Sequence, residues 1–339
     1  MSHKIKAFGE VMMRLEVPDY KKIEQTNELQ MMFAGTGVNF LAALTNYGHD
    51  TSLITKLPQT NIGQAALKHI RSLGIGTEDV VIGDQYLGIY FLESGFANRP
   101  SKVTYSDRQT SSFNQASIDD YHIEAILENT HLIHFCGIAL ALSETTRQIT
   151  LNLAERAKEL GITVVFDSNY RPGLWKDDYV LARKYYDKML HLSDIAFMSD
   201  KDASLLLQFK TNEETEQGRL EDLLKKVSHQ YKIRTIACTR RKSANQTTHQ
   251  TLQGFLLHDG DIVYSKIYPN HILDRIGAGD AFASGIIHGL VHNLPIEETV
   301  EFATAAGVLA HSTYGDTPLC NQEDVWNLIH QDGHIDIER

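Results

Sequence analysis

The sequence is poor in the residues and segments that define several classes of protein. Its 339 residues hold only three cysteines, Cys136, Cys238 and Cys320, whose odd number and wide spacing argue against a disulfide framework or a zinc knuckle. No apolar run approaches the roughly 18 residues of a membrane helix. The N-terminal sequence MSHKIKAFGEVMMRL lacks the apolar stretch of a signal peptide. These absences predict a reduced, cytoplasmic protein with no membrane partner.

Positive charge is scarce as well. The chain has 32 Lys and Arg against 43 Asp and Glu, a formal net charge of −11. Its basic clusters are only two or three residues long, which argues against nucleic acid as a partner because phosphate backbones are bound by clustered Lys and Arg. A small anionic substrate is compatible with this charge, because charges beyond roughly 10 Å are screened and a few local arginines act at short range.

Short apolar runs alternate with helical patterns over most of the chain. We expect buried strands at 5–8, 52–55, 132–135, 163–167, 195–198 and 235–238, and helices at 37–47, 62–73, 144–160, 179–192 and 221–229. This alternation predicts an α/β fold with a doubly wound, mainly parallel sheet. Ligands of such sheets bind beyond the carboxyl ends of the strands, so we expect the functional residues to lie there.

Two segments, at about 12–34 and 86–110, break this alternation. They carry strand-like residues without a helical period, and we expect them to form antiparallel additions outside the main sheet. A pair of surface hairpins and a lid over a ligand explain the pattern about equally well. No linker separates independent domains, so the sequence predicts one domain over residues 1–339 with these two segments inserted.

A glycine-rich turn near the C-terminus carries the most chemical information. The sequence Asp274-Arg-Ile-Gly277-Ala278-Gly279-Asp280 leads directly into an apolar helix of small residues. Consecutive N–H groups at a helix start bind anions, and glycine lets a ligand approach the backbone. The helix N-terminus favours the carboxylate form of Asp280, which then accepts a proton. An anion cradle beside a proton acceptor fits phosphoryl transfer to a hydroxyl.

Other motifs are absent or weak. The chain has no GxxxxGKS/T, no strand-to-helix GxGxxG and no GxSxG. His288 and His292 are four residues apart on the predicted helix after Asp280, a spacing that can bind a metal ion. Because no Glu lies between them in HExxH fashion, ordinary surface or core histidines are the favoured interpretation of this pair.

Several motifs together resemble a known family. GAGDAF at 277–282, the early turn AGTGVNFLAAL at 34–44 and the α/β pattern are similar to the PfkB, or ribokinase-like, carbohydrate kinases. A second set of segments resembles the branch of 2-keto-3-deoxygluconate kinases: GEVMMRL at 9–15, LGIYFLE at 87–93, RPSKVTYSDR at 99–108, HFCGIALALS at 134–143 and FDSNYRPGLW at 166–175. The resemblance runs from about residue 5 to residue 328.

This resemblance implies an ATP-dependent kinase that phosphorylates the terminal hydroxyl of a sugar acid, 2-keto-3-deoxygluconate or a near relative. It implies that Asp280 is the base and that the backbone of Gly277, Ala278 and Gly279 stabilises the transferred phosphoryl group. It also implies substrate contacts by Gly35, Asn39, Tyr90, Tyr105, Arg108, Arg171, Asp274 and Thr313.

The resemblance extends to the cofactors, and the lid strands bear on assembly. The implied nucleotide positions are Asn169, Ser199, Thr239, Arg241, Ala244, Gly277 and Gly279. Mg²⁺ is expected to bridge the phosphates, mostly through water, with Asp202 beside it; a monovalent cation is left open. Exposed lid strands offer an edge for a second subunit, so we expect a homodimer or a larger homo-oligomer formed through the lid.

Two alternatives remain open at this point. One is a kinase of the same fold for a neutral sugar such as fructose or ribose, which would not need Arg108 and Arg171 to hold a carboxylate. The other is a non-catalytic sugar- or nucleotide-binding regulator. It is motivated by the loop Thr-Arg-Arg-Lys-Ser-Ala at 239–244, which lacks the two glycines that the family normally has there. A regulator could dispense with Asp280, so its presence favours an enzyme.

Overall fold

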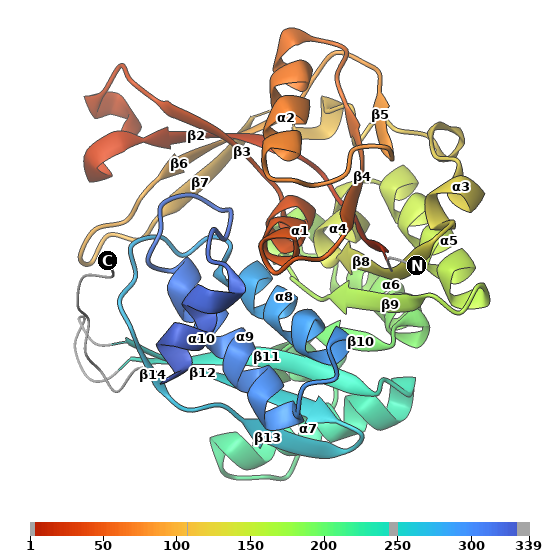
Figure 1. Ribbon diagram of the computed structural model, residues 1–339, viewed down its shortest axis with the longest axis vertical. Coiled ribbons are helices and arrows are strands. Elements are labelled where there is room, and N and C mark those ends of the chain that lie inside the picture. Colours follow the sequence, from red (N-terminus) through yellow and green to blue (C-terminus); the bar gives the residue numbers. More distant parts are fainter. Residues whose placement is uncertain (1–3, 107, 244–249, 331–339) are drawn as a thin grey trace.

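A twisted sheet of ten strands crosses the molecule in this computed structural model, which describes residues 4–106, 108–243 and 250–330 (Figure 1). The strands lie in the order β13 (Asp261–Tyr264), β12 (Gln250–His258), β11 (Thr235–Ser243), β10 (Ile195–Phe197), β9 (Thr163–Asp167), β8 (Thr130–Cys136), β1 (Lys4–Phe8), β4 (Thr51–Leu57) and β5 (Val80–Ile82), with β14 (Tyr268–Asn270) paired to β12. The pairs from β11 to β5 are parallel, and those of β12 are antiparallel.

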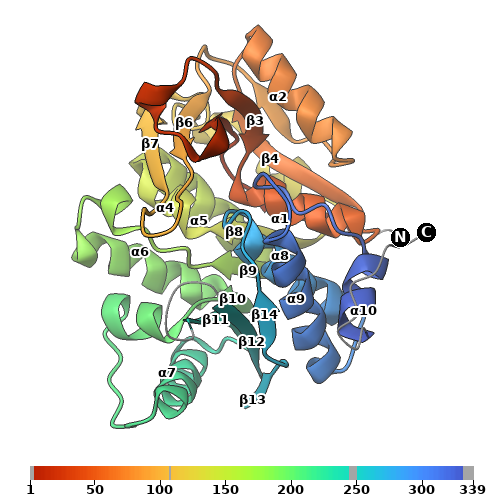
Figure 2. The same cartoon turned by 90° about the vertical axis from the view of Figure 1, so that its left-hand side faces the viewer.

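Helices cover both faces of the sheet, as Figure 2 shows. One face carries α1 (Thr36–Asn46), α2 (Asn61–Ser72), α8 (Ala278–Val291), α9 (Ile296–Ala310) and α10 (Gln322–His330), and the other carries α3 (Ile123–Leu127), α4 (Gly137–Leu142), α5 (Glu144–Glu159), α6 (Tyr179–Leu192) and α7 (Glu216–Tyr231). Successive strand residues point to opposite faces, so that Phe8 packs in one core and Ala7 in the other. The predicted doubly wound α/β fold is confirmed.

Most predicted elements of the main sheet agree with the structure to within a few residues. The bounds of β9 and α6 coincide with the prediction, β10 ends one residue before the predicted position 198, and the other predicted strands are extended by one to five residues. Helix α7 begins at Glu216, before the predicted residue 221, because Thr215 caps it by accepting a hydrogen bond from the N–H of Gly218 at 3.0 Å. No helix among the described residues is long and apolar enough to cross a bilayer.

The segments at 12–34 and 86–110 form a separate four-stranded sheet, which we call the lid sheet; residue 107 lies outside the described residues. Its order is β3 (Gln30–Ala34), β2 (Met12–Val17), β6 (Gly88–Glu93) and β7 (Lys102–Ser106). The outer pairs are antiparallel, but β2 and β6 are parallel. The expectation of purely antiparallel additions is therefore wrong at the central pair. The physical reason is that the chain enters β2 and β6 from β1 and β5, which run in the same direction through the main sheet.

Candidate active site

A cavity of about 630 Å³ lies at the carboxyl ends of β8 to β11, beneath the lid sheet. Its wall includes Cys136, Asp167, Met198 and Cys238 from the ends of these strands, and Val103 from the lid. The first turns of α1 and α8 close its floor. This is the edge at which a doubly wound sheet was expected to hold its ligand.

Most of the residues implied by the sequence resemblance converge on this cavity. Its lining includes Gly35, Asn39, Tyr90, Tyr105, Arg108, Asn169, Arg171, Ser199, Asp202, Thr239, Arg241, Gly277, Gly279 and Asp280. Ala278, Asp274 and Thr313 are not part of the lining, and Ala244 lies outside the described residues. Residues more than 240 positions apart in the chain thus share one wall.

The start of α8 presents backbone N–H groups to the cavity. Gly277 has φ of +83°, and a Cβ there would lie 1.8 Å from the carbonyl oxygen of Asp316. Gly279 is exposed and has no atom within 4 Å of a Cβ position, so a ligand can approach its backbone. The side chain of Ala278 is buried with Ala281 and Ala310, so only the backbone of Ala278 can contact a ligand. The turn has the geometry of an anion cradle.

Asp280 is buried in the first turn of α8 and lines the cavity. Its Oδ2 accepts a hydrogen bond from Nδ2 of Asn39 at 2.8 Å. Burial, followed by the charge of Asp167, raises the pKa of Asp280 well above its usual value. The expectation that the helix N-terminus keeps the carboxylate form favoured is therefore wrong in direction, because desolvation opposes the charged form more strongly.

Two further carboxylates face the same cavity. Burial raises the pKa of Asp167 to about 6, and nearby Asp202 adds to the rise, although a hydrogen bond from Asn169 opposes it. Oδ2 of Asp202 accepts hydrogen bonds from Ser199, from its backbone N–H at 2.8 Å and from its Oγ at 2.9 Å. Asp167, Asp202 and Asp280 are therefore three of the five carboxyl residues that line the cavity, where a cation would relieve their repulsion.

Glu10 and Tyr105 hold the side chain of Arg108. Its Nε donates to Oε2 of Glu10 at 2.6 Å, and its guanidinium lies 4.9 Å from the ring centroid of Tyr105. The buried Nη1 of Arg108 has no hydrogen-bond partner among the described residues. Arg171 differs, because it is exposed and, within the part of the chain that the structure describes, donates only to the carbonyl of Tyr170, at 3.5 Å.

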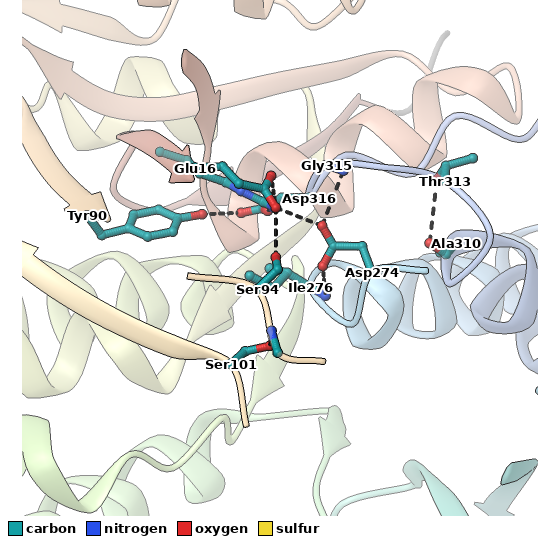
Figure 3. A network of polar contacts seen from close by, with 12 residues as sticks. Glu16, Tyr90, Ser94, Ser101, Asp274, Ile276, Ala310, Thr313, Gly315 and Asp316 are labelled. Atoms are coloured by element: carbon teal, nitrogen blue, oxygen red, sulfur yellow. Dashed lines mark hydrogen bonds and ion pairs between the residues drawn. The ribbon is translucent and has the colours of Figure 1, made fainter. Parts of the chain in front are cut away.

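Asp274 lies behind the cavity wall rather than in it. Its carboxylate accepts hydrogen bonds from the backbone N–H groups of Ile276, at 3.1 Å, and Gly315, at 3.3 Å. Figure 3 shows these contacts and also Thr313, whose hydroxyl faces the carbonyl of Ala310 at 3.5 Å. These two predicted substrate contacts thus hold loops next to the cavity in this structure.

Asp274 belongs to a buried ionic network around Arg14, a residue of β2 that is fully buried. Nη2 of Arg14 donates to Oδ2 of Asp274 at 2.7 Å and to Oε2 of Glu16 at 2.6 Å, and Nη1 donates to Asp316. The hydroxyl of Tyr90 donates to Asp316 at 2.6 Å (Figure 3). The network therefore ties the lid sheet to the loops on both sides of α8 and α9.

Sequence reasoning missed several residues of the cavity wall. Glu10, Thr36, Asp167, Arg275 and Asp316 line it in addition to those predicted. The available signal for Asp167 was its place as an acidic residue at the carboxyl end of a predicted buried strand. Glu10 and Asp316 carried no such signal, because their partners lie 98 and 302 positions away.

Known proteins of similar sequence or fold are described as carbohydrate kinases. The family model described as "pfkB family carbohydrate kinase" matches residues 2–323. A crystal structure from Enterococcus faecalis, provisionally described as a 2-keto-3-deoxygluconate kinase, is 39% identical with a TM-score of 0.95, covering 100% of this chain and 99% of that one. The crystal structure of a Thermotoga maritima 2-dehydro-3-deoxygluconokinase is 32% identical with a TM-score of 0.92, covering 97% and 100%. A 2-dehydro-3-deoxygalactonokinase from Haloferax volcanii is 27% identical over the whole of both chains.

Proposed function

Because the chain belongs to the PfkB family of carbohydrate kinases, we propose that it transfers the γ-phosphoryl group of ATP to the terminal hydroxyl of a sugar acid. The favoured substrate is 2-keto-3-deoxygluconate, with its 6-phosphate as product. The names of its relatives support a 2-keto-3-deoxy sugar acid, and they include both the gluconate and the galactonate forms. Family membership also favours a kinase over the non-catalytic regulator.

The environment of Arg108 is the observation that favours a sugar acid over a neutral sugar as the substrate. Its Nε is fixed by Glu10 at 2.6 Å, which leaves the buried Nη1 without a partner among the described residues. A buried guanidinium N–H without an acceptor is costly, and a substrate carboxylate would satisfy it with a charge-assisted hydrogen bond. Tyr90 and Tyr105 of the lid sheet line the same part of the cavity and suit the apolar edge of the sugar.

Asp280 is the proposed general base. A carboxyl group with a raised pKa is a stronger proton acceptor once it is ionised. Asp280 lines the cavity next to Asn39, so a substrate hydroxyl bound there would lie within its reach. The N–H groups of the turn at 277–279 would stabilise charge on the transferred phosphoryl group. Arg171, exposed at the cavity rim, would bind phosphate.

The nucleotide would lie along the ends of β9 to β11. Asn169, Ser199, Thr239 and Arg241 line that side of the cavity. The carboxyl groups of Asp167 and Asp202 fit Mg²⁺, a hard cation that prefers oxygen ligands and retains water. When bound, Mg²⁺ would offset charge on the phosphates. Asp202 would offer the cation its Oδ1, because Oδ2 accepts two hydrogen bonds from Ser199.

The proposal is tested by ADP release over a panel of 2-keto-3-deoxygluconate, 2-keto-3-deoxygalactonate, fructose and ribose. We expect turnover with the two acids, which differ in configuration at C4, and at least a hundredfold lower kcat/KM with the neutral sugars. Turnover restricted to fructose or ribose would reject the sugar-acid assignment in favour of a neutral-sugar kinase.

We also propose that residues 1–339 act as one kinase domain and pair with a second copy through the lid sheet. The supporting observation is β7, whose five residues are all exposed at the edge of that sheet. Unpaired edge strands are ready templates for pairing. The molar mass measured by light scattering during gel filtration should be that of a dimer or a larger assembly. The Val103→Lys variant should have a mass closer to that of the monomer.

A further inference from the structure

Three histidines meet at the end of α8 that lies away from the cavity. His288 lies in the last turn of α8 and His292 directly follows the helix, while His49 lies in the loop between α1 and β4. One ligand nitrogen from each ring lies within 4.8 Å of the other two. The ring centroids form a triangle with sides of 4.5 Å, 5.2 Å and 5.3 Å.

The spacing of the nitrogens is close to that of a metal centre. Nε2 of His49 lies 2.9 Å from Nδ1 of His288. Two imidazole nitrogens that each bind tetrahedral zinc at about 2.0–2.1 Å are about 3.3 Å apart. A small rotation of the rings therefore brings these nitrogens into coordination distance. The third ligand, His292, is exposed, so an ion can enter from solvent.

Aromatic side chains hold His288, the buried member of the cluster, in place. Phe302 stacks against His288 at 4.8 Å and Tyr47 packs against it at 5.3 Å, which fixes the orientation of this ring.

The cluster is separate from the phosphoryl-transfer site. Helices α1 and α8 run in the same direction, because Asn39 contacts Asp280 near their N-terminal ends and Tyr47 contacts His288 near their C-terminal ends. With a rise of 1.5 Å per residue, the histidines lie roughly 12–18 Å along α8 from Asp280. A metal ion there cannot touch the reacting groups.

We propose that His49, His288 and His292 bind one divalent transition-metal ion of the Zn²⁺ type, with water or another small ligand completing the coordination. Imidazole ligands select Zn²⁺, Cu²⁺ or Ni²⁺ over Mg²⁺, which prefers oxygen. The ion would join the C-terminal ends of the two helices whose N-terminal ends form the cavity floor. Its role would be to stabilise the folded chain, because ion binding to the folded state alone shifts the unfolding equilibrium.

Calorimetric titration of untagged, chelator-treated protein with Zn²⁺ tests this site. We expect one ion per chain and a rise in Tm with Zn²⁺ that Mg²⁺ does not reproduce. His292→Ala and His49→Gln should each weaken binding at least tenfold and abolish the rise in Tm. His229→Ala, which removes an exposed histidine on α7, is the matched control and should bind as the wild type does.

Two results would overturn the proposal: an absence of Zn²⁺ binding by the wild type, or binding of equal strength in His292→Ala and His49→Gln. Either would leave the cluster as an imidazole–imidazole hydrogen bond with a neighbouring ring. Kinase activity of His292→Ala shows that this variant is folded. It also separates failure of the metal site from failure of the proposed kinase reaction, which does not involve these histidines.

Discussion

At the scale of single residues, the cavity concentrates carboxyl groups, and this has a cost for folding. Burial raises the pKa of Asp280 and sets that of Asp167 at about 6. A carboxyl whose pKa is higher in the folded than in the unfolded chain binds its proton more tightly when folded. Its cost is therefore absent below the ordinary pKa near 4 and grows as the pH rises toward the folded value. Without ligands, these carboxyl groups should therefore lower the free energy of unfolding at pH 8 relative to pH 5.

The substitution Asp280→Asn should lower activity and raise stability. The amide cannot accept the hydroxyl proton, so kcat should fall about 10²–10⁴-fold. Without a buried charge, Tm should rise, and the gain should be larger at pH 8 than at pH 5. ADP release and thermal unfolding measure the two effects. Wild-type turnover by the amide variant would exclude Asp280 as the base.

Replacement Arg108→Lys should affect binding of the acid selectively. Lysine keeps the charge but not the planar fork that contacts Glu10 through Nε and leaves Nη1 for a carboxylate. We expect KM for the sugar acid to rise about tenfold or more, the effect of losing one charge-assisted hydrogen bond. Steady-state kinetics check this, with Arg183→Lys on the exposed surface of α6 as the control. An unchanged KM would show that Arg108 does not bind the carboxylate.

At the scale of elements, the start of α8 depends on one backbone conformation. Gly277 has a left-handed φ of +83°, and a Cβ there would lie 1.8 Å from the carbonyl oxygen of Asp316. Gly161, with φ of +72°, has no atom within 4 Å of its Cβ position. Alanine substitutions at the two positions therefore separate two effects: the strain of a left-handed φ, which both share, and the clash of a Cβ with Asp316, which occurs only at Gly277.

Gly277→Ala should lower the free energy of unfolding by more than Gly161→Ala does. The latter pays only the left-handed penalty, about 1–2 kcal/mol. The former also displaces the loop that carries Asp316, so activity should be lost together with stability. Denaturant unfolding and ADP release measure both. Equal destabilisation by the two substitutions would contradict the proposed close contact.

The sequence predicted β9 and α6 to the residue, but it missed β5 and also β12, although β12 has buried side chains in both cores. β9 and α6 coincide with the prediction because an unbroken apolar run and a cap at Asp178 define them. β5 was not predicted, since its three residues are only partly buried. The parallel pairing of β2 with β6 also could not be read from the chain, because either direction preserves the same alternation of side chains.

At the scale of the whole molecule, Arg14 joins parts of the chain that are far apart in sequence. Burial lowers the pKa of its guanidinium, but the charges of Asp316 and Asp274 outweigh this and raise it above its usual value. Its partners lie 260 and 302 positions away. Within a strand pattern, an arginine is typical of a solvent-exposed position. For this reason sequence reasoning did not find the network, although most of the site residues that it predicted line the cavity.

Arg14→Met should destabilise the protein strongly. It leaves Glu16, Asp274 and Asp316 buried without their cation, and breaking a buried pair in this way costs about 3–5 kcal/mol. Denaturant unfolding checks the expected loss. Arg156→Met is the control, because its ion pairs with Glu124 and Glu159 are on the surface and should not contribute measurably. Equal stabilities of the two variants would show that the network does not hold the lid sheet.

The parallel pair at the centre of the lid sheet also bears on the order of folding. Between β2 and β6 the chain forms β3, α1, β4, α2 and β5, so the two strands meet only after this whole unit has been brought together. Contacts across long chain separations form slowly because loop closure must precede them. The central pair of the cavity's cover therefore cannot form as a local hairpin, and it depends on the α/β unit that the chain builds between its two strands.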